Sequence, residues 1–454
     1  MAVVIILAGG RGKRMKAPLP KVLMPLAGQS LLESVVRSAH KIKPKQIVLV
    51  GSHDVFAHPL WQDLQKQWVQ TVPECSSCLQ NNPGGTGHAV QTAFSYIRPF
   101  LEADEQKIVL CHGDMPLIQA ETLQALAESP ADFTVSGVRL KNPEASTFGR
   151  IEVNSAGAPI RIFETRDATE EQKKVSLANA AFYAVSRACL EACLFELTSQ
   201  NAAQELYFTD LLVLAVQKGF STCLLEVDAD EATGFDTLED LQTFPVQTFL
   251  RKKMMQRGVL FQDPASVMLS IDTEIGAGTT VAPFNVLGPS VQLGAKVTLE
   301  PFCVLDHCVI KDGCVVGPFA HIKAQSCVES QAVIGNFVEI KKSNVGEKTK
   351  VKHLSYIGDA SLGPRVNVGA GTVVCNYDGI HKHPTVIESG VQVGANSTLV
   401  APLTIAEAAF VGAGSVITEN VPTETLALGR ARQVHKLEWV RKRREKIRTK
   451  KEME

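Results

Sequence analysis

Apolar runs alternate with amphipathic stretches along the first half of the chain. Short apolar runs such as VVIILA, QIVLVG, KIVLCHGD and FTVSGVRL are separated by segments with helical spacing, such as SLLESVVRSAHKI and ETLQALAES. This alternation predicts a Rossmann-like α/β domain over residues 1–238, with a mainly parallel sheet and helices on both faces. Ligands of such sheets bind at the carboxyl ends of the strands.

From about residue 258 the hydrophobic pattern shortens to a period of six. Aliphatic residues recur at Val316, Ile322 and Val328, and the same spacing runs from Ile387 to Ile417. Neither an α-helix nor a heptad repeats every six residues, whereas a parallel β-helix does, because three short strands make each coil. We therefore predict a left-handed parallel β-helix of hexapeptide repeats over residues 258–454.

Three segments depart from these two patterns. The six-residue repeat breaks over about residues 375–385, CNYDGIHKHPT, where we expect a loop to leave the coil, and loops on rigid scaffolds often carry function. Residues 239–257 are expected to form a helical linker, kinked at Pro245. The basic C-terminal tail, KLEWVRKRREKIRTKKEME, is either a solvated helix or a contact for an anion or a partner.

Composition narrows the classes of function. The chain has 46 Lys and Arg against 47 Asp and Glu, so its net charge of -1 creates no overall field that favours nucleic acid or an anionic membrane. No run of about 18 apolar residues is present. The eleven cysteines, an odd number spread along the chain, fit reduced thiols better than a disulfide framework. We expect a cytoplasmic protein that binds neither nucleic acid nor membranes.

The apolar run at residues 3–8 leads into glycines and cations, LAGGRGKRM, and then into LPKVL. Glycines let the backbone turn sharply and present N–H groups to an anion. The cations that could neutralise phosphate charge are Arg11, Lys13, Arg14 and Lys21. The spacing fits neither a Walker A loop, which needs Ser or Thr after the lysine, nor the three glycines of a dinucleotide fingerprint. On these residues alone, the segment is either a phosphate-binding loop or a solvated basic turn.

LAGGRGKRM followed by LPKVL resembles the L-A-A-G-x-G-T-R-M…L-P-K signature of sugar-1-phosphate nucleotidyltransferases. With hexapeptide repeats behind it, the chain is similar, from Val3 to about Arg430, to the bifunctional bacterial UDP-N-acetylglucosamine pyrophosphorylase/glucosamine-1-phosphate N-acetyltransferases. The resemblance implies acetyl transfer from acetyl-CoA to glucosamine 1-phosphate. It then implies uridylyl transfer from UTP to N-acetylglucosamine 1-phosphate with release of pyrophosphate, which feeds cell-wall and lipopolysaccharide precursor synthesis. It also implies a Mg²⁺ cofactor and a homotrimer.

By this resemblance, the first half holds the nucleotide, the sugar phosphate and the metal. Arg14 and Lys21 are implied as catalytic residues that contact the nucleotide phosphates. The other implied nucleotide and sugar contacts are Leu7, Ala8, Gly9, Gly10, Gln80, Gly85, Thr86, Gly149, Glu164 and Asn179. Asp114 and Asp236 match the metal-ligand positions, and two carboxylates suffice because Mg²⁺ fills its octahedron with water and substrate phosphates. Taken alone, Asp114 could equally cap the turn after its strand.

The second half is implied to carry the acetyltransferase. His353, in VKHLSYIGDA, matches the general base, and an imidazole with an ordinary pKa of about 6.5 suits that role. The implied substrate contacts are Lys323, Lys341, Tyr356 and Asn367. The implied acetyl-CoA contacts are Ala370, Asn376, Tyr377, Ala395, Ala413 and Arg430. Outside this context, a lone histidine is more often a satisfied surface or core residue.

The chain departs from the family pattern at several positions. Lys323 stands where the family has Arg, which keeps the charge but loses the bidentate grip on phosphate. Ala395 replaces a common Ser, Lys13 replaces a Thr, and NAA at 179–181 replaces N-T-G. Asp236 stands where the bifunctional family usually has Asn. Two alternatives follow: a nucleotidyltransferase whose β-helix serves only oligomerisation or regulation, and a non-catalytic scaffold that has kept both folds.

Overall fold

The computed structural model describes residues 2–10, 12, 14–101 and 107–453, so Arg11 and Lys13 of the glycine-rich segment lie outside the described residues. The chain forms two compact units. Unit 1 is Met1–Leu250 with Ser270–Asp272, and unit 2 is Arg251–Leu269 with Thr273–Glu454. Among the described residues, no helix is long and apolar enough to cross a membrane.

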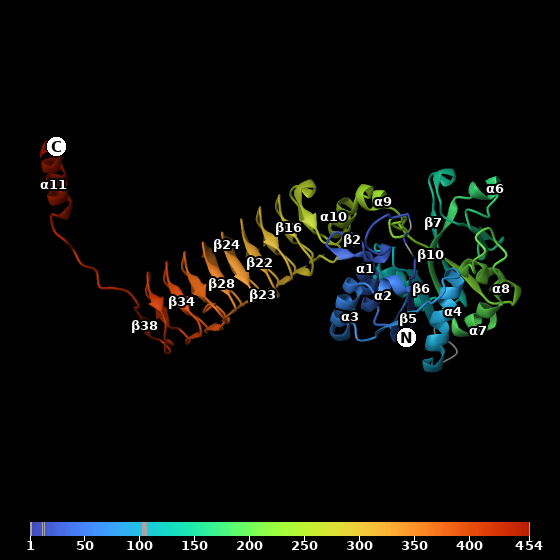
Figure 1. Cartoon of the computed structure of the whole chain (residues 1–454), viewed down its shortest axis with the longest axis horizontal. Helices are drawn as coiled ribbons and strands as arrows, with labels where there is room; N and C mark the ends of the chain where they lie inside the picture. The colour runs from blue at the N-terminus through green and yellow to red at the C-terminus, as the bar shows by residue number, and fades with distance from the viewer. Residues whose placement is uncertain (1, 11, 13, 102–106, 454) are drawn as a thin grey trace. The chain divides into compact units, whose positions relative to one another are not determined.

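Unit 1 is built on a mainly parallel sheet with the strand order β11-β7-β10-β6-β1-β4-β5 (Figure 1). These strands are β1 (Val3–Ala8), β4 (Gln46–Gly51), β5 (Cys75–Leu79), β6 (Lys107–His112), β7 (Phe133–Arg139), β10 (Leu177–Ser186) and β11 (Thr222–Glu226). Only β10 runs antiparallel to its neighbours in this order, β6 and β7. The short strands β8 (Arg150–Val153) and β9 (Pro159–Phe163) pair beside β10. The predicted Rossmann-like α/β fold is confirmed.

Apolar side chains cover both faces of this sheet because its strands are apolar at successive positions. In β1, Val3 and Ile5 join one buried cluster, while Val4 and Ile6 join the other. The helices packed on the first cluster are α4 (Thr86–Ile97), α7 (Arg187–Cys193) and α8 (Leu211–Gln217). Those packed on the second are α1 (Leu31–Lys41), α3 (Pro59–Thr71) and α5 (Ala120–Glu128). The sheet is thus a rigid platform that fixes the loops at its strand ends.

Unit 2 contains three parallel sheets of very short strands, stacked as coils of a column (Figure 1). The ten-stranded sheet runs from β12 (Leu260–Phe261) to β38 (Leu426–Ala427), the nine-stranded sheet from β13 (Met268–Leu269) to β37 (Val416–Ile417), and the eight-stranded sheet from β14 (Glu274–Ile275) to β35 (Leu403–Ile405). Each strand pairs with the third strand after it along most of the column, and the six-residue positions predicted to point inward, such as Val316 and Ile322, are fully buried. The left-handed parallel β-helix is confirmed.

The predicted loop leaves the column between β31 (Val373–Cys375) and β32 (Thr385–Ile387). Ala360 pairs in register with Thr385, an interval of 25 residues, whereas Cys308 pairs with Ser326, an interval of 18. The loop therefore adds residues to one coil without disturbing the stack. Elsewhere, Phe244 and Pro245 separate α9 (Leu238–Thr243) from α10 (Val246–Gln256), and the basic tail contains the exposed helix α11 (Trp439–Met453).

Two candidate active sites

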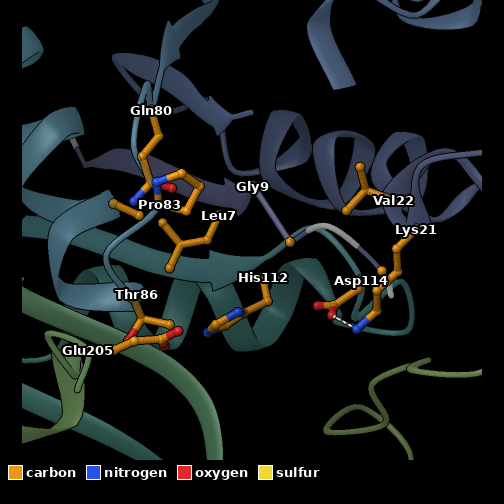
Figure 2. Close-up of a pocket in the computed structure, with 14 residues that line it drawn as sticks. Leu7, Gly9, Lys21, Val22, Gln80, Pro83, Thr86, His112, Asp114 and Glu205 are labelled. Atoms are coloured by element: carbon orange, nitrogen blue, oxygen red, sulfur yellow. Dashed lines mark ion pairs between the residues drawn. The ribbon is translucent and has the colours of Figure 1, made fainter. Parts of the chain in front are cut away.

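In unit 1, a cleft of about 580 Å³ lies at the carboxyl ends of β1, β5 and β6 (Figure 2). The predicted nucleotide-site residues that line it are Leu7, Gly9, Gly10, Lys21, Gln80, Gly85 and Thr86, together with Asp114. A second cavity of about 240 Å³ shares Leu7, Thr86 and His112 with the cleft, and it contains the predicted sugar contacts Gly149, Glu164 and Asn179. Residues from eight separate segments of the sequence thus line two cavities that share part of their lining.

Acidic and basic side chains meet at one end of the cleft. Lys21, in the short helix η1 (Lys21–Leu23), donates hydrogen bonds from Nζ to Asp114 Oδ2 and to Asp236 Oδ1, and its side chain is only 9% exposed. Arg14 Nη2 lies 2.9 Å from Asp236 Oδ2. Two carboxylates therefore converge on one cation, although they are separated by more than a hundred residues in the sequence. Such a pair of hard oxygen donors fits a divalent cation that completes its shell with phosphate oxygens and water.

Burial and charge act in opposite directions on these groups. Burial would raise the pKa of Asp114, but the neighbouring Lys21 and His112 charges and the hydrogen bond from Lys21 bring that pKa below its usual range. For Lys21, burial lowers the pKa, while Asp114 and Asp236 raise it above its ordinary value overall. Asp114 is therefore a carboxylate at neutral pH, the form that a metal ligand requires.

The far end of the cleft is shaped by the turn that enters α4. Gly85 has φ of 100°, and a Cβ at this position would lie 2.6 Å from the carbonyl oxygen of Leu206, so only glycine fits. Gly87 N donates to the same oxygen (2.7 Å), and Phe208 N donates to Thr86 Oγ1 (3.0 Å). These bonds fix the segment around residue 206 against the start of α4. Figure 2 shows Thr86 and Glu205 at this end, Lys21 and Asp114 at the other, and His112 between them.

The smaller cavity contains a buried carboxyl group and a bulged strand. Glu164 Oε1 accepts a hydrogen bond from Thr209 Oγ1 (2.8 Å), and burial, assisted by Asp210 and Asp167, raises the pKa of Glu164 despite that bond. In β10, Asn179 Nδ2 donates to Tyr183 Oη (2.7 Å). The register of the strand shifts between these two residues.

Ala181 lies within that irregular stretch of β10. Its φ is 61°, in the left-handed region, and its N–H donates to Asn179 Oδ1 (3.1 Å). The family has glycine at this position of the N-T-G pattern, and glycine adopts such a φ without strain. Alanine at position 181 therefore keeps the bulge, but it is strained there because its backbone adopts a left-handed conformation.

Some residues of unit 1 differ from expectation in their position. Ala8 and Arg14 line neither cavity. Ala8 is buried within β1. The side chain of Arg14 is 69% exposed and reaches the site through its ion pair with Asp236. Among the lining residues that sequence reasoning missed are Val22, Pro83, His112, Tyr183, Glu205 and Thr209. His112 could have been found, because it ends β6 two residues before Asp114.

In unit 2, part of the predicted acetyltransferase set lies along one edge of the column, where each coil turns from the ten-stranded to the nine-stranded sheet. Equivalent positions on successive coils of this edge, which we call the His353 edge, are Asn336, His353, Ala370, Ala395 and Ala413. Backbone hydrogen bonds connect the coils here: Leu354 N donates to Asn336 O, and Gly371 N to His353 O. The same pattern continues with Asn396 N to Ala370 O and Gly414 N to Ala395 O. A histidine and three alanines thus follow one another along a single line.

His353 ends β27 (Lys350–His353) and is exposed, with Nδ1 2.8 Å from Asn336 Oδ1. Tyr356 begins β28 (Tyr356–Gly358), directly around the turn. On the nine-stranded sheet, Lys323 of β22 (His321–Lys323) pairs in register with Lys341 of β25 (Glu339–Lys341). Lys323 Nζ also lies 2.9 Å from Glu339 Oε1. Two lysines on adjacent strands of the same sheet suit a phosphorylated ligand.

The acetyl-CoA contacts implied by the resemblance lie beyond His353 along the column. Asn376 is buried and donates from Nδ2 to Asp359 Oδ2 (2.5 Å), whereas Tyr377 is 59% exposed and donates to Gly379 O (2.6 Å). Arg430 passes close to Gly414, where a Cβ would lie 3.8 Å from Arg430 Cδ. Arg430 thus extends the His353 edge toward the end of the column, whereas Asn376 and Tyr377 follow β31 and lie at the next edge, where the coil turns from the nine-stranded to the eight-stranded sheet.

One predicted substrate contact is not brought to His353. Asn367, in β30 (Asn367–Val368), pairs in register with Lys350, at the opposite end of β27 from His353. Three residues of extended chain separate the two positions by about 10 Å. Within one chain, Asn367 therefore lies away from the histidine.

Comparison with known proteins covers both units. A family model described as a MobA-like NTP transferase domain matches residues 4–205. The chain is 38% identical over 462 residues to the bifunctional protein GlmU of Synechococcus sp. strain RCC307, covering 97% of this chain and 99% of that protein. It is 39% identical over 463 residues to the bifunctional protein GlmU of Thermotoga maritima, with the same coverage. The similarity therefore extends from the cleft of unit 1 through the His353 edge of unit 2.

Proposed function

Because the chain belongs to the GlmU family of bifunctional UDP-N-acetylglucosamine pyrophosphorylase/glucosamine-1-phosphate N-acetyltransferases, it is a bifunctional enzyme of UDP-N-acetylglucosamine synthesis, and we propose that unit 1 carries uridylyl transfer and unit 2 carries acetyl transfer. The observation that carries this division is that the charged cleft lies wholly within unit 1 and His353 with its two lysines wholly within unit 2. Each unit holds the chemistry of one reaction.

In unit 1, the cleft positions two phosphorylated substrates. UTP occupies the larger cavity, with its phosphates near Lys21 and Arg14, and N-acetylglucosamine 1-phosphate occupies the smaller one beside Glu164 and Asn179. An oxygen of the sugar phosphate attacks the α-phosphorus of UTP, a new P–O bond forms, and the bond to the departing pyrophosphate breaks. Positioning and charge neutralisation supply the catalysis, so no protein nucleophile is needed.

The family implies a divalent metal for this reaction, and we propose Mg²⁺ held by Asp114 and Asp236. When bound, the ion neutralises phosphate charge and orients the phosphates for in-line attack. The convergence of both carboxylates on Lys21 supports the assignment, since it brings their oxygens to one place. Asp236 adds a charge where the family usually has a neutral amide, which strengthens the case for a cation there.

In unit 2, His353 is the proposed general base for acetylation of glucosamine 1-phosphate. Lys323 and Lys341 hold the phosphate, and His353 accepts a proton from the amine as its nitrogen attacks the thioester carbonyl carbon of acetyl-CoA. The N–C bond forms, the C–S bond breaks, and the proton passes on to the sulfur of the released CoA. The alanines at positions 370, 395 and 413 leave the His353 edge open for the pantetheine arm.

We also propose a homotrimer in which neighbouring columns complete the acetyltransferase sites. Four phenylalanines, Phe284, Phe302, Phe319 and Phe337, stack on successive coils with ring centroids 5.0 to 5.1 Å apart. This phenylalanine ladder leads to the turn of His353, and each of its side chains is about half exposed. An exposed apolar stripe of this length marks an interaction surface. A neighbouring chain would also supply an Asn367, which the same chain does not bring to His353.

The cysteines support a cytoplasmic location. All eleven are free thiols. Burial raises the pKa of Cys308 to about 12 and that of Cys314 to about 11, so these thiols stay protonated and unreactive. Reduced, structural thiols are the usual state in a cytoplasmic protein.

The test follows both products in one preparation. Release of the CoA thiol from acetyl-CoA and glucosamine 1-phosphate measures acetyl transfer, and release of pyrophosphate from UTP and N-acetylglucosamine 1-phosphate measures uridylyl transfer. We expect His353→Ala to lower thiol release at least a hundredfold and to leave pyrophosphate release unchanged. Pyrophosphate release without thiol release in the unmodified protein would instead assign the β-helix a structural role.

A further inference from the structure

Asn336 precedes His353 by one coil on the His353 edge. It ends β24 (Val333–Asn336), and its backbone pairs in register with that of His353. Asn336 O also accepts from Leu354 N (3.0 Å), and Asn336 Oδ1 lies 2.8 Å from His353 Nδ1. The asparagine is thus held by the strand ladder at the position where it meets the imidazole ring.

This contact distinguishes the two ring nitrogens of His353. An amide oxygen accepts hydrogen bonds and cannot donate them, so its partner nitrogen must carry the proton. In a neutral imidazole only one nitrogen carries a proton. A proton on Nδ1 therefore leaves the lone pair on Nε2, which is the form that a general base needs.

The hydrogen-bond partner of the histidine is uncharged, and the nearest charged side chains lie on its own strand and beyond the turn. The strands on either side of β27, which are β24 and β30, contain no titratable side chain. Lys350 and Lys352 lie on β27 itself, Tyr356 lies across the turn, and Glu339 and Lys341 lie on the strand beyond it. A carboxylate in place of Asn336 would stabilise the imidazolium and lower the fraction of free base at neutral pH.

We propose that Asn336 is a positioning residue for acetyl transfer, holding His353 in the tautomer and orientation that present Nε2 to the amine. The inference rests on the proposed role of His353 as the base. The Asn336 amide orients the His353 ring as a carboxylate would, but it adds no charge.

The test compares Asn336→Ala and Asn336→Asp with a matched control, Asn344→Ala, an exposed asparagine of β26 (Asn344–Val345) on the eight-stranded sheet. For Asn336→Ala we expect kcat of acetyl transfer to fall about tenfold, the loss of one hydrogen bond, while the KM of both substrates changes less than twofold. For Asn336→Asp we expect the acidic limb of the kcat profile to move up by about one pH unit. Asn344→Ala should match the unmodified protein throughout.

Two results separate failure of this inference from failure of the proposed function. If His353→Ala abolishes acetyl transfer but Asn336→Asp leaves the pH profile where it was, the positioning role is wrong and the base assignment stands. If His353→Ala retains acetyl transfer, the base assignment itself is wrong and the role of Asn336 falls with it. Uridylyl transfer by the same preparations shows that unit 1 of each variant is folded, and an unchanged KM of acetyl transfer shows the same for unit 2.

Discussion

The two sites differ in how much of each a single chain completes. In unit 1, Lys21 is nearly buried at the end of a cleft that strand ends and loops of the same chain enclose. In unit 2, His353 is exposed on an edge, and Asn367 lies at the other end of its neighbouring strand. The contrast follows from the folds. Parallel strands with helical crossovers bring many loops together at one sheet edge, whereas a β-helix places one residue per coil along an exposed edge.

The largest effect expected is from removing one carboxylate of unit 1. Asp114→Ala should lower uridylyl transfer about a thousandfold, because it removes a proposed metal ligand, while acetyl transfer stays within twofold. The measurement is pyrophosphate and thiol release from one preparation. Loss of both activities in a protein that still unfolds cooperatively would contradict the division of labour between the two units.

A smaller effect should come from breaking the phenylalanine ladder. Replacing Phe302 and Phe319 by serine should weaken association and lower acetyl transfer about tenfold at low protein concentration, with uridylyl transfer unaffected. Sedimentation velocity gives the oligomeric state in parallel with both assays. The matched control is Phe195→Ser, which removes an exposed phenylalanine of unit 1. If the double variant still sediments as a trimer with full acetyl transfer, the ladder is not the contact between chains.

Lys323→Arg should strengthen phosphate binding at the proposed acetyltransferase site. A guanidinium can grip phosphate with two parallel hydrogen bonds, so the KM for glucosamine 1-phosphate should fall about threefold at unchanged kcat. Lys311→Arg, an exposed lysine on the same column, serves as the control. An unchanged KM would show that Lys323 is occupied by Glu339 and does not contact the phosphate.

The smallest effect is expected in the smaller cavity of unit 1. Ala181→Gly should stabilise that unit by about 0.5–1 kcal/mol, since relief of the left-handed alanine outweighs the extra freedom of glycine in the unfolded chain. Urea unfolding monitored by tryptophan fluorescence measures the change. Ala180→Gly, a buried neighbour without positive φ, should destabilise instead, and a loss of stability in both variants would refute the strain at Ala181.

Much of the fold follows from periodic patterns in the sequence. The six-residue repeat predicts the coils and their interior, and its interruption predicts the loop between β31 and β32, because each inward position must be apolar to be buried. The alternation of apolar runs and helical segments predicts the sheet of unit 1. The antiparallel insertion of β10 was not predicted, since a single strand carries no signal of its direction.

Site residues could be predicted from the sequence only where a family motif contains them. In the cleft, Lys21 contacts Asp236, which lies 215 residues further along the sequence, and no local sequence pattern predicts that contact. Asn336 was missed for the same reason, because its contact with His353 joins two separate strands, whereas His112 precedes Asp114 by two residues and could have been found. The strain at Ala181 depends on a backbone torsion that only the bulge in β10 creates.

The coils of the column are evenly spaced, so the number of coils between two residues on the His353 edge sets the distance between them. Neighbouring strands in a sheet lie about 4.8 Å apart, so the three coil steps from His353 to Ala413 span about 14 Å. On the proposed path of acetyl-CoA, a donor anchored at Ala413 reaches the base only if its thioester hangs on an arm of at least that length. On that path the number of coils would set the shortest acyl donor that the enzyme accepts, and deleting one coil between the two residues would shorten that length.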